Sequence, residues 1–61
     1  MFEIGDLVWA KWVMDHPVEK RKIGLIVGVK DDMFVVEWTG GLDTLSQHNG
    51  GYFHFNLVRI P

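Results

Sequence analysis

This sequence of 61 residues contains no cysteine, only two prolines and no long apolar run. Without cysteine the chain has no disulfide, no thiol nucleophile and no thiolate ligand for zinc. No apolar stretch approaches the ~18 residues of a membrane-spanning helix, and residues 1–6 lack the basic and apolar regions of a signal peptide. We therefore expect a cytoplasmic protein without a membrane anchor.

An excess of positive charge is also absent, because six Lys and Arg residues stand against eight Asp and Glu residues, for a net charge of −2. A protein that binds nucleic acid without sequence preference is expected to be basic. The charge balance argues against that function for the chain as a whole, while a local basic patch remains compatible with it.

A chain of 61 residues is short for a stable core, because a domain of this length buries only about 60% of the surface of its unfolded chain. Hydrophobic residues make up 48% and charged residues 23%, which is typical of a folded domain. We expect one domain over residues 1–61, too small for a multi-domain enzyme. Each large apolar side chain must be buried within this chain or against another one.

Apolar residues alternate over strand-length segments bounded by turn residues, which predicts an all-β chain. Val8 and Ala10 are expected to point inward, and Glu37 to mark a solvent face. Gly24 and Gly28 indicate bends. The predicted strands are residues 7–14, 22–29, 33–38, 52–54 and 57–60, with a turn at 30–32, another at 55–56 and a long loop over 42–51.

Five short antiparallel strands are too few for a two-sheet sandwich of ordinary depth. An open flat sheet would leave its edges and half of its apolar residues exposed. Closing the sheet on itself removes both problems. The sequence therefore predicts a small, strongly bent five-stranded antiparallel barrel with a long loop before the fourth strand.

Four segments resemble those of SH3-like small β-barrels, namely the opening 5–11, the Gly-rich 24–27, the strand end 36–38 and the terminal 56–60. The opening is similar to that of Tudor and PWWP chromatin readers, and the size is similar to that of short barrel proteins of bacteriophages and marine viral sequences. The resemblance implies an SH3-like barrel that binds other molecules, of phage-like or environmental origin, located in a host cytoplasm or a virion. The residues after Met14 lack the aromatic signature with which PWWP domains complete a methyl-lysine cage.

Aromatic residues are the main candidates for a binding site. The resemblance places Trp12 and Trp38 near positions where Tudor-like domains build an aromatic cage, and Tyr52 lies on another strand. Such rings attract a quaternary ammonium group through their negative faces. The alternative, which is favoured in so small a chain, is that the same rings form core or interface packing.

Trp9 is expected to point outward, because its neighbours Val8 and Ala10 point inward. An outward tryptophan among other exposed apolar side chains indicates a surface for a partner protein. The predicted outward apolar residues are Leu7, Trp9, Val13 and Val35.

The only basic run is Lys20, Arg21 and Lys22, which supports nucleic-acid contact as an alternative function. The spacing of His16, His48 and His54 does not suit a metal site, and no nucleophile or cofactor motif is present. We therefore expect no metal, no cofactor and no enzymatic activity. The leading hypothesis is a protein-interaction or assembly module, acting as a homo-oligomer. The alternatives are a nucleic-acid-binding barrel and a reader of methyl-lysine or peptides.

Overall fold

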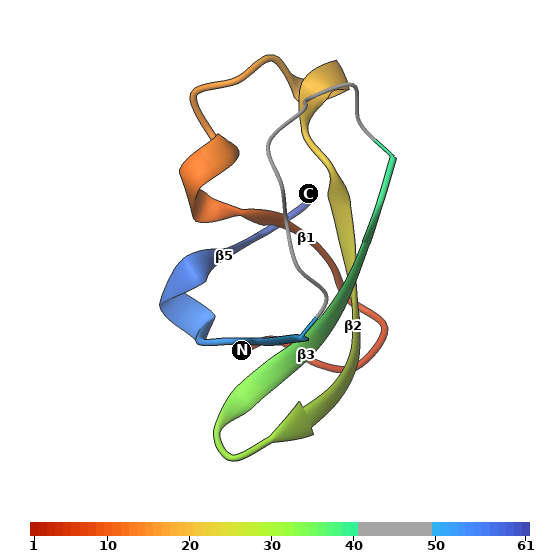
Figure 1. The fold of residues 1–61 in the computed structure, drawn as a ribbon, viewed down its shortest axis with the longest axis vertical. Coiled ribbons are helices and arrows are strands. Elements are labelled where there is room, and N and C mark those ends of the chain that lie inside the picture. Colours follow the sequence, from red (N-terminus) through yellow and green to blue (C-terminus); the bar gives the residue numbers. More distant parts are fainter. Residues whose placement is uncertain (41–49) are drawn as a thin grey trace.

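The computed structural model describes residues 1–40 and 50–61 and contains one five-stranded antiparallel sheet (Figure 1). The strands are β1 (Leu7–Ala10), β2 (Ile23–Lys30), β3 (Met33–Thr39), β4 (Gly50–Tyr52) and β5 (Leu57–Arg59). Three short 3-10 turns accompany them, η1 (Lys11–Val13), η2 (Val18–Lys20) and η3 (His54–Asn56). The prediction of an all-β antiparallel chain is confirmed.

The order of the strands is β4-β3-β2-β1-β5. The long β2–β3 ribbon runs along the molecule, while β1 and β5 run across it (Figure 1). A β-bulge between Ile26 and Gly28 shifts the register of this ribbon, and bulges bend and twist the strand that carries them. None of the strand pairs formed by the described residues joins β4 to β5, so the sheet is bent but open between these two edges.

The core takes one buried side chain from each of four strands, Val8, Ile26, Val36 and Leu57. This arrangement follows from the two-residue period of a strand, in which alternate side chains face opposite sides. The predicted inward direction of Val8 and the solvent face marked by Glu37 are both confirmed. Partly buried rings of Phe2, Phe34, Trp38 and Tyr52 pack around this cluster.

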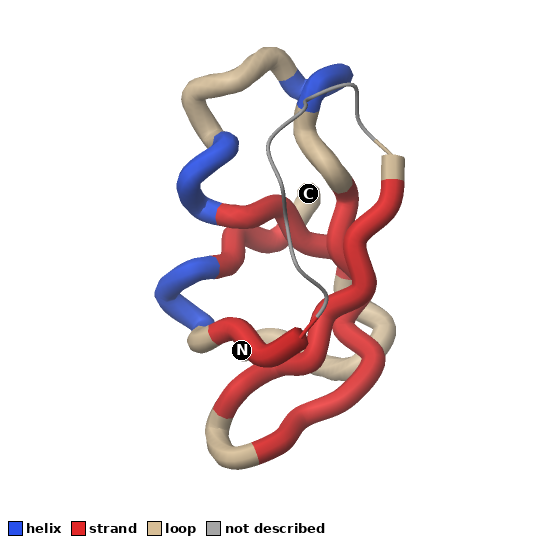
Figure 2. Tube along the Cα trace, in the orientation of Figure 1, coloured by secondary structure: helices blue, strands red, loops and turns tan. Residues whose placement is uncertain are grey.

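The first strand is shorter than predicted. It ends at Ala10 rather than at residue 14, and η1 follows immediately (Figure 2). In a 3-10 turn, side chains three residues apart lie on the same side. Val13 therefore follows Ala10 into the interior and has no exposed surface, whereas Trp12 turns outward. The prediction that Val13 points outward is wrong, because it extended the two-residue period of a strand through this turn.

The fourth strand also lies elsewhere than predicted, at Gly50–Tyr52 instead of residues 52–54. Gly50 and Gly51 pair with Val36 and Val35 on β3. The residues that follow form η3, in which the Asn56 amide donates to the Phe53 carbonyl over 2.9 Å. The greater part of the long loop predicted over 42–51 lies outside the described residues.

The predicted turn at 30–32 is confirmed as a two-residue hairpin loop between Lys30 and Met33. Both of its central residues, Asp31 and Asp32, have left-handed φ angles of 52° and 64°. This conformation matches the right-handed twist of a hairpin; aspartate is common at the first of the two positions, whereas the second position, Asp32, favours glycine. The turn therefore closes β2 onto β3 at a cost in backbone energy.

Candidate functional site

Three aromatic side chains from different elements meet on one side of the sheet, and we call Trp12, Tyr52 and Trp38 the aromatic cluster. The ring centroids of Trp12 and Tyr52 are 5.9 Å apart with an interplanar angle of 32°. Trp38 meets Tyr52 edge to face, at 5.4 Å and 85°. Trp38 and Tyr52 are half-buried against the core, whereas Trp12 keeps 44% of its surface exposed. The structure thus brings together the three aromatic residues proposed from the sequence as a binding site.

The position of Trp38 depends on a glycine directly across the sheet. Gly24 pairs with Trp38 in the register of β2 and β3. A Cβ atom at Gly24 would lie only 2.6 Å from Cζ3 of Trp38 and 2.6 Å from Cγ1 of Val36. The indole therefore occupies the space that a side chain at residue 24 would take, and its edge reaches Tyr52 from there.

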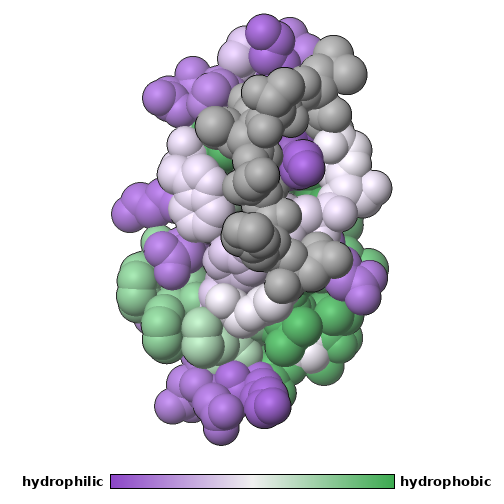
Figure 3. Space-filling model, viewed as in Figure 1, coloured by the Kyte–Doolittle hydropathy of each residue, from purple (hydrophilic) through white to green (hydrophobic). Residues whose placement is uncertain are grey.

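A second aromatic pair lies beside the cluster, one ring directly before η3 and one within it, and η3 packs against η1. The rings of Phe53 and Phe55 stack with centroids 5.3 Å apart and an interplanar angle of 8°, and both are exposed. Apolar side chains gather over η3 in the lower left of the space-filling view (Figure 3). No site was predicted for these residues, because a strand was expected over 52–54.

The predicted partner surface of Leu7, Trp9, Val13 and Val35 is not a single patch. Leu7 is exposed, Val35 is half-buried and Val13 belongs to the interior. Trp9 is half-buried, since the guanidinium carbon of Arg21 lies 4.7 Å from its ring centroid. Only Leu7 therefore offers the free apolar surface that the sequence predicted for the whole group.

An apolar stripe on the outer face of the sheet was not assigned to a site from the sequence. Leu7 on β1 pairs with Leu25 on β2, and Leu25 pairs in turn with Glu37 on β3. Leu7, Leu25 and the neighbouring Ile23 and Val27 are all exposed. The alternation of β2 contained this signal, because residues 23, 25 and 27 oppose the buried positions 24 and 26.

The basic run predicted for nucleic-acid contact is partly used within the chain. Arg21 donates from Nε to the His16 carbonyl over 2.9 Å and from Nη2 to the Met14 carbonyl over 2.7 Å. Lys20 is exposed and Lys22 is half-buried. Arg21 thus holds the connection between β1 and β2 in place, and its stacking on Trp9 covers another part of the guanidinium.

An open cleft of about 530 Å³ lies at the hairpin end of the sheet. The rings of Phe2 and Phe34 meet edge to face at 5.7 Å within it. It is lined by Met1, Phe2, Val29, Asp32, Phe34 and His54. The sequence did not predict this cleft, because its residues come from the N-terminal segment, the β2–β3 hairpin and η3, and no local pattern links them.

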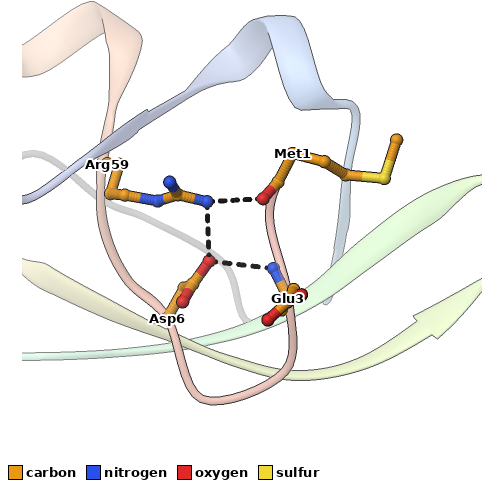
Figure 4. A network of polar contacts seen from close by, with 4 residues as sticks. All are labelled: Met1, Glu3, Asp6 and Arg59. Atoms are coloured by element: carbon orange, nitrogen blue, oxygen red, sulfur yellow. Dashed lines mark hydrogen bonds and ion pairs between the residues drawn. The ribbon is translucent and has the colours of Figure 1, made fainter.

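A polar network holds the N-terminal segment beside this cleft (Figure 4). Nη2 of Arg59 donates to the Met1 carbonyl and to Oδ2 of Asp6, the latter over 3.0 Å. The Glu3 amide donates to the same Asp6 oxygen over 2.8 Å. The hydrogen bond from Glu3, together with the positive charge of Arg59, holds the pKa of Asp6 below its ordinary value of 3.8. The Arg59 guanidinium also lies 5.3 Å from the ring of Phe2, so the network fixes one wall of the cleft.

Metal ligation finds no support in residues 1–40 and 50–61, where no three His, Asp or Glu side chains are grouped to hold an ion. His16 lies in the connection between η1 and η2 and His54 begins η3, while His48 falls outside the described residues. No helix among the described residues is long and apolar enough to cross a bilayer. Comparison of the chain with protein-family models, curated proteins and solved structures gave no match.

Proposed function

We propose that this chain is a non-enzymatic protein-interaction module built on an SH3-like barrel. The observation that carries the proposal is the exposure of Trp12 at the edge of the aromatic cluster. Tryptophan is among the residues most enriched at the energetic centres of protein interfaces. An indole that is 44% exposed while one face rests on Tyr52 is held in place and still has surface to offer a partner.

The arrangement of the strands supports the barrel part of this proposal. The five strands follow one another in the order β4-β3-β2-β1-β5, and β1 and β5 cross the direction of β2 and β3 (Figure 1). A sheet bent in this way brings its two edges toward the same side of the core. A partner that binds over Trp12 would lie against η1 and η3, which pack together at that side.

A selection from a displayed library of random peptides tests the interaction. Trp12→Ala is expected to weaken the selected peptides at least 10-fold, since truncating an interface tryptophan typically costs about 2 kcal/mol or more. Val18→Ala is the matched control, because Val18 is also exposed but belongs neither to the aromatic cluster nor to the apolar stripe. Equal weakening by both variants, or by neither, would contradict the proposed surface.

A reader of methylated lysine is the second candidate, because the same cluster brings three aromatic rings into contact. The rings of Trp38 and Tyr52 stand almost at right angles. Yet the centroid distances of 5.4 and 5.9 Å mean that neighbouring rings already touch, which leaves no slot between them for a cation. A trimethyl-ammonium group would have to bind on the free face of Trp12. Tighter binding of a trimethyl-lysine peptide than of its unmodified form, measured by tryptophan fluorescence, would favour this candidate over general peptide binding.

Self-association is proposed as one form of the interaction, with a second copy as the partner. The apolar stripe of Leu7, Ile23, Leu25 and Val27 adds to the surface available for it. Sedimentation velocity at micromolar concentration is expected to show a dimer or larger species that Leu25→Glu dissociates. A wild-type chain that sediments as a monomer would limit the proposal to other protein partners.

Nucleic-acid binding receives less support than protein interaction or methyl-lysine reading, because the guanidinium of Arg21 already hydrogen-bonds two carbonyl groups and stacks on Trp9. A salt titration separates this alternative from the others. Binding through phosphate contacts weakens steeply as the salt concentration rises. Absence of binding to single-stranded and double-stranded nucleic acid at low salt would remove it.

A further inference from the structure

The cleft at the hairpin end is distinct from the aromatic cluster, with which it shares no residue. Its volume of about 530 Å³ falls within the range of about 300–1,000 Å³ that ligand pockets occupy. Its lining is mainly apolar, through Met1, Phe2, Val29 and Phe34, and its polar side chains are Asp32 and His54. An apolar wall with a few polar groups is the usual composition of a binding site.

From this cleft we infer a second recognition site, for a peptide segment that presents a basic side chain next to an aromatic or long aliphatic one. The apolar side chain packs against Phe2, Val29 and Phe34. The basic side chain pairs with the carboxylate of Asp32. This inference does not depend on the function proposed for Trp12.

The chemistry of Asp32 sets the charge of the occupant. An ionised carboxylate accepts hydrogen bonds and donates none, so its best partner is a cationic donor. No residue among those described hydrogen-bonds or ion-pairs with this carboxylate. Lys30 is the nearest basic residue in the hairpin, and it pairs with Met33. This pair is one position along from the Val29–Phe34 pair that lines the cleft, so the Lys30 side chain points to the opposite face of the ribbon.

The other ionisable groups at the cleft, the Met1 amino group and the His54 ring, do not pair with Asp32. The positive charge of the Met1 amino group helps to lower the pKa of Asp6, and the Met1 carbonyl accepts from Arg59 in the network that anchors the N-terminal segment (Figure 4). His54 contacts Phe55 edge to face at 5.5 Å, which orients its ring on η3. Asp32 therefore supplies the acceptor to which a cation on a partner would bind.

The openness of the cleft to solvent favours a peptide side chain over a free small molecule. Val29 is 58% exposed, and Met1, Asp32 and His54 are exposed as well. Pockets for small ligands bury about 70–90% of the ligand surface, which a groove with such exposed walls does not do. A peptide can place one side chain in the groove and keep its main chain outside.

Titration of the isotope-labelled protein with capped peptides tests this site by NMR. The probe contains phenylalanine followed by lysine between glycines, and a matched peptide carries glutamine in place of lysine. We expect the lysine peptide to shift the amide signals of Phe2, Val29 and Phe34 and to bind about 2–5 times more tightly than the glutamine peptide, as for a solvent-exposed ion pair. Shifts centred on Trp12 and Tyr52 would overturn the assignment to the cleft.

Two pairs of variants separate the charge from the apolar wall. Asp32→Asn should abolish the preference for lysine, whereas Asp31→Asn, which changes the neighbouring residue of similar backbone conformation, should keep it. Val29→Ser should weaken both peptides about 3-fold or more through loss of apolar contact, while Val18→Ser should not, although Val18 is 57% exposed. A lysine preference that survives Asp32→Asn would overturn the ion pair.

A third probe distinguishes a peptide from a free amine. Phenethylamine carries the ring and the charge without a peptide main chain. We expect it to bind at least 3-fold more weakly than the lysine peptide. Equal affinity would overturn the peptide as occupant and assign the cleft to a small apolar amine.

Discussion

Gly24 allows the packing of β2 against β3 to be tested with a single methyl group. In Gly24→Ala, the new Cβ would lie 2.6 Å from both Trp38 and Val36, where ordinary contact begins at 3.4 Å. Contact can be restored only if these side chains move by about 0.8 Å, the difference between the two distances. Val36 is completely buried and has no free space to enter, while a shift of Trp38 would disturb its edge-to-face contact with Tyr52.

The size of the effect follows from two opposing contributions. Overpacking a core costs about 1–3 kcal/mol, whereas replacing glycine by alanine gains about 0.4–1 kcal/mol through the lower entropy of the unfolded chain. We expect Gly24→Ala to lower the free energy of unfolding by about 1–2 kcal/mol. A chain of 61 residues is expected to have only about 3–9 kcal/mol in total. The loss should therefore be large enough to measure readily.

Gly28→Ala is the matched control on the same strand. A Cβ at Gly28 would meet Val35 at 3.8 Å, an ordinary contact, so this variant should be as stable as the wild type or more stable by about 0.4–1 kcal/mol. Urea unfolding followed by tryptophan fluorescence measures the stability of both variants. Equal stability of the two variants would refute the close contact at residue 24.

Three further predictions concern polar groups. The double variant Asp31→Asn and Asp32→Gly should have a free energy of unfolding about 1–2 kcal/mol higher than the wild type, since both residues have left-handed backbone conformations that asparagine and glycine adopt more easily. Urea titration measures this gain, and an unchanged midpoint would show that the turn is not strained. Because the pKa of Asp6 in the folded state lies below its ordinary value of 3.8, its carboxylate stabilises the fold above that pH and loses this effect as the pH falls through the folded-state pKa. Wild type should therefore exceed Asp6→Asn in stability at neutral pH and approach it in acid, and a difference independent of pH would count against the mechanism. Arg21→Lys should lower the free energy of unfolding by about 1–3 kcal/mol, because one ammonium group cannot reproduce the guanidinium fork that reaches two carbonyl oxygens. Thermal unfolding of the variant and the wild type measures this loss, and a variant as stable as the wild type would contradict it.

Much of the sheet could be predicted from the alternation of apolar residues. Val8 and Ala10 are buried as expected, and Val36 and Glu37 face opposite sides of β3. When one face of a strand is buried, every second residue must be apolar, so the buried face can be predicted from the sequence. The tight turn after β2 could also be predicted, because aspartate is common in turns.

The ends of the elements were harder to predict, and Val13 shows the reason. The run from Leu7 to Met14 remains apolar enough to continue a strand, yet the chain enters a 3-10 turn at Lys11. Since the period changes from two residues to three, the inward positions after that point change as well. In the structure η1 packs against η3, a tertiary contact that the local sequence does not contain.

Of the two candidate sites, one could be predicted from the sequence and the other could not. The aromatic cluster could be proposed because the resemblance to Tudor-like domains singles out Trp12 and Trp38, and because large rings on separate segments, such as that of Tyr52, must find partners. The cleft could not be proposed, because Phe2 and His54 lie more than fifty residues apart and meet only through the polar network at Arg59 and the position of η3.

The pairing of the first strand with the last has a consequence for biosynthesis. Ala10 pairs with Leu57, and Val8 pairs with Arg59, so β1 gains its second neighbour only from residues near the end of the sequence. On the ribosome, the β2–β3 hairpin can close as soon as it emerges, but Leu57 is still missing from the core. Folding of this sheet can therefore be completed only after residues 57–59 have left the exit tunnel, and until then the Val8 side chain lacks part of the core that buries it.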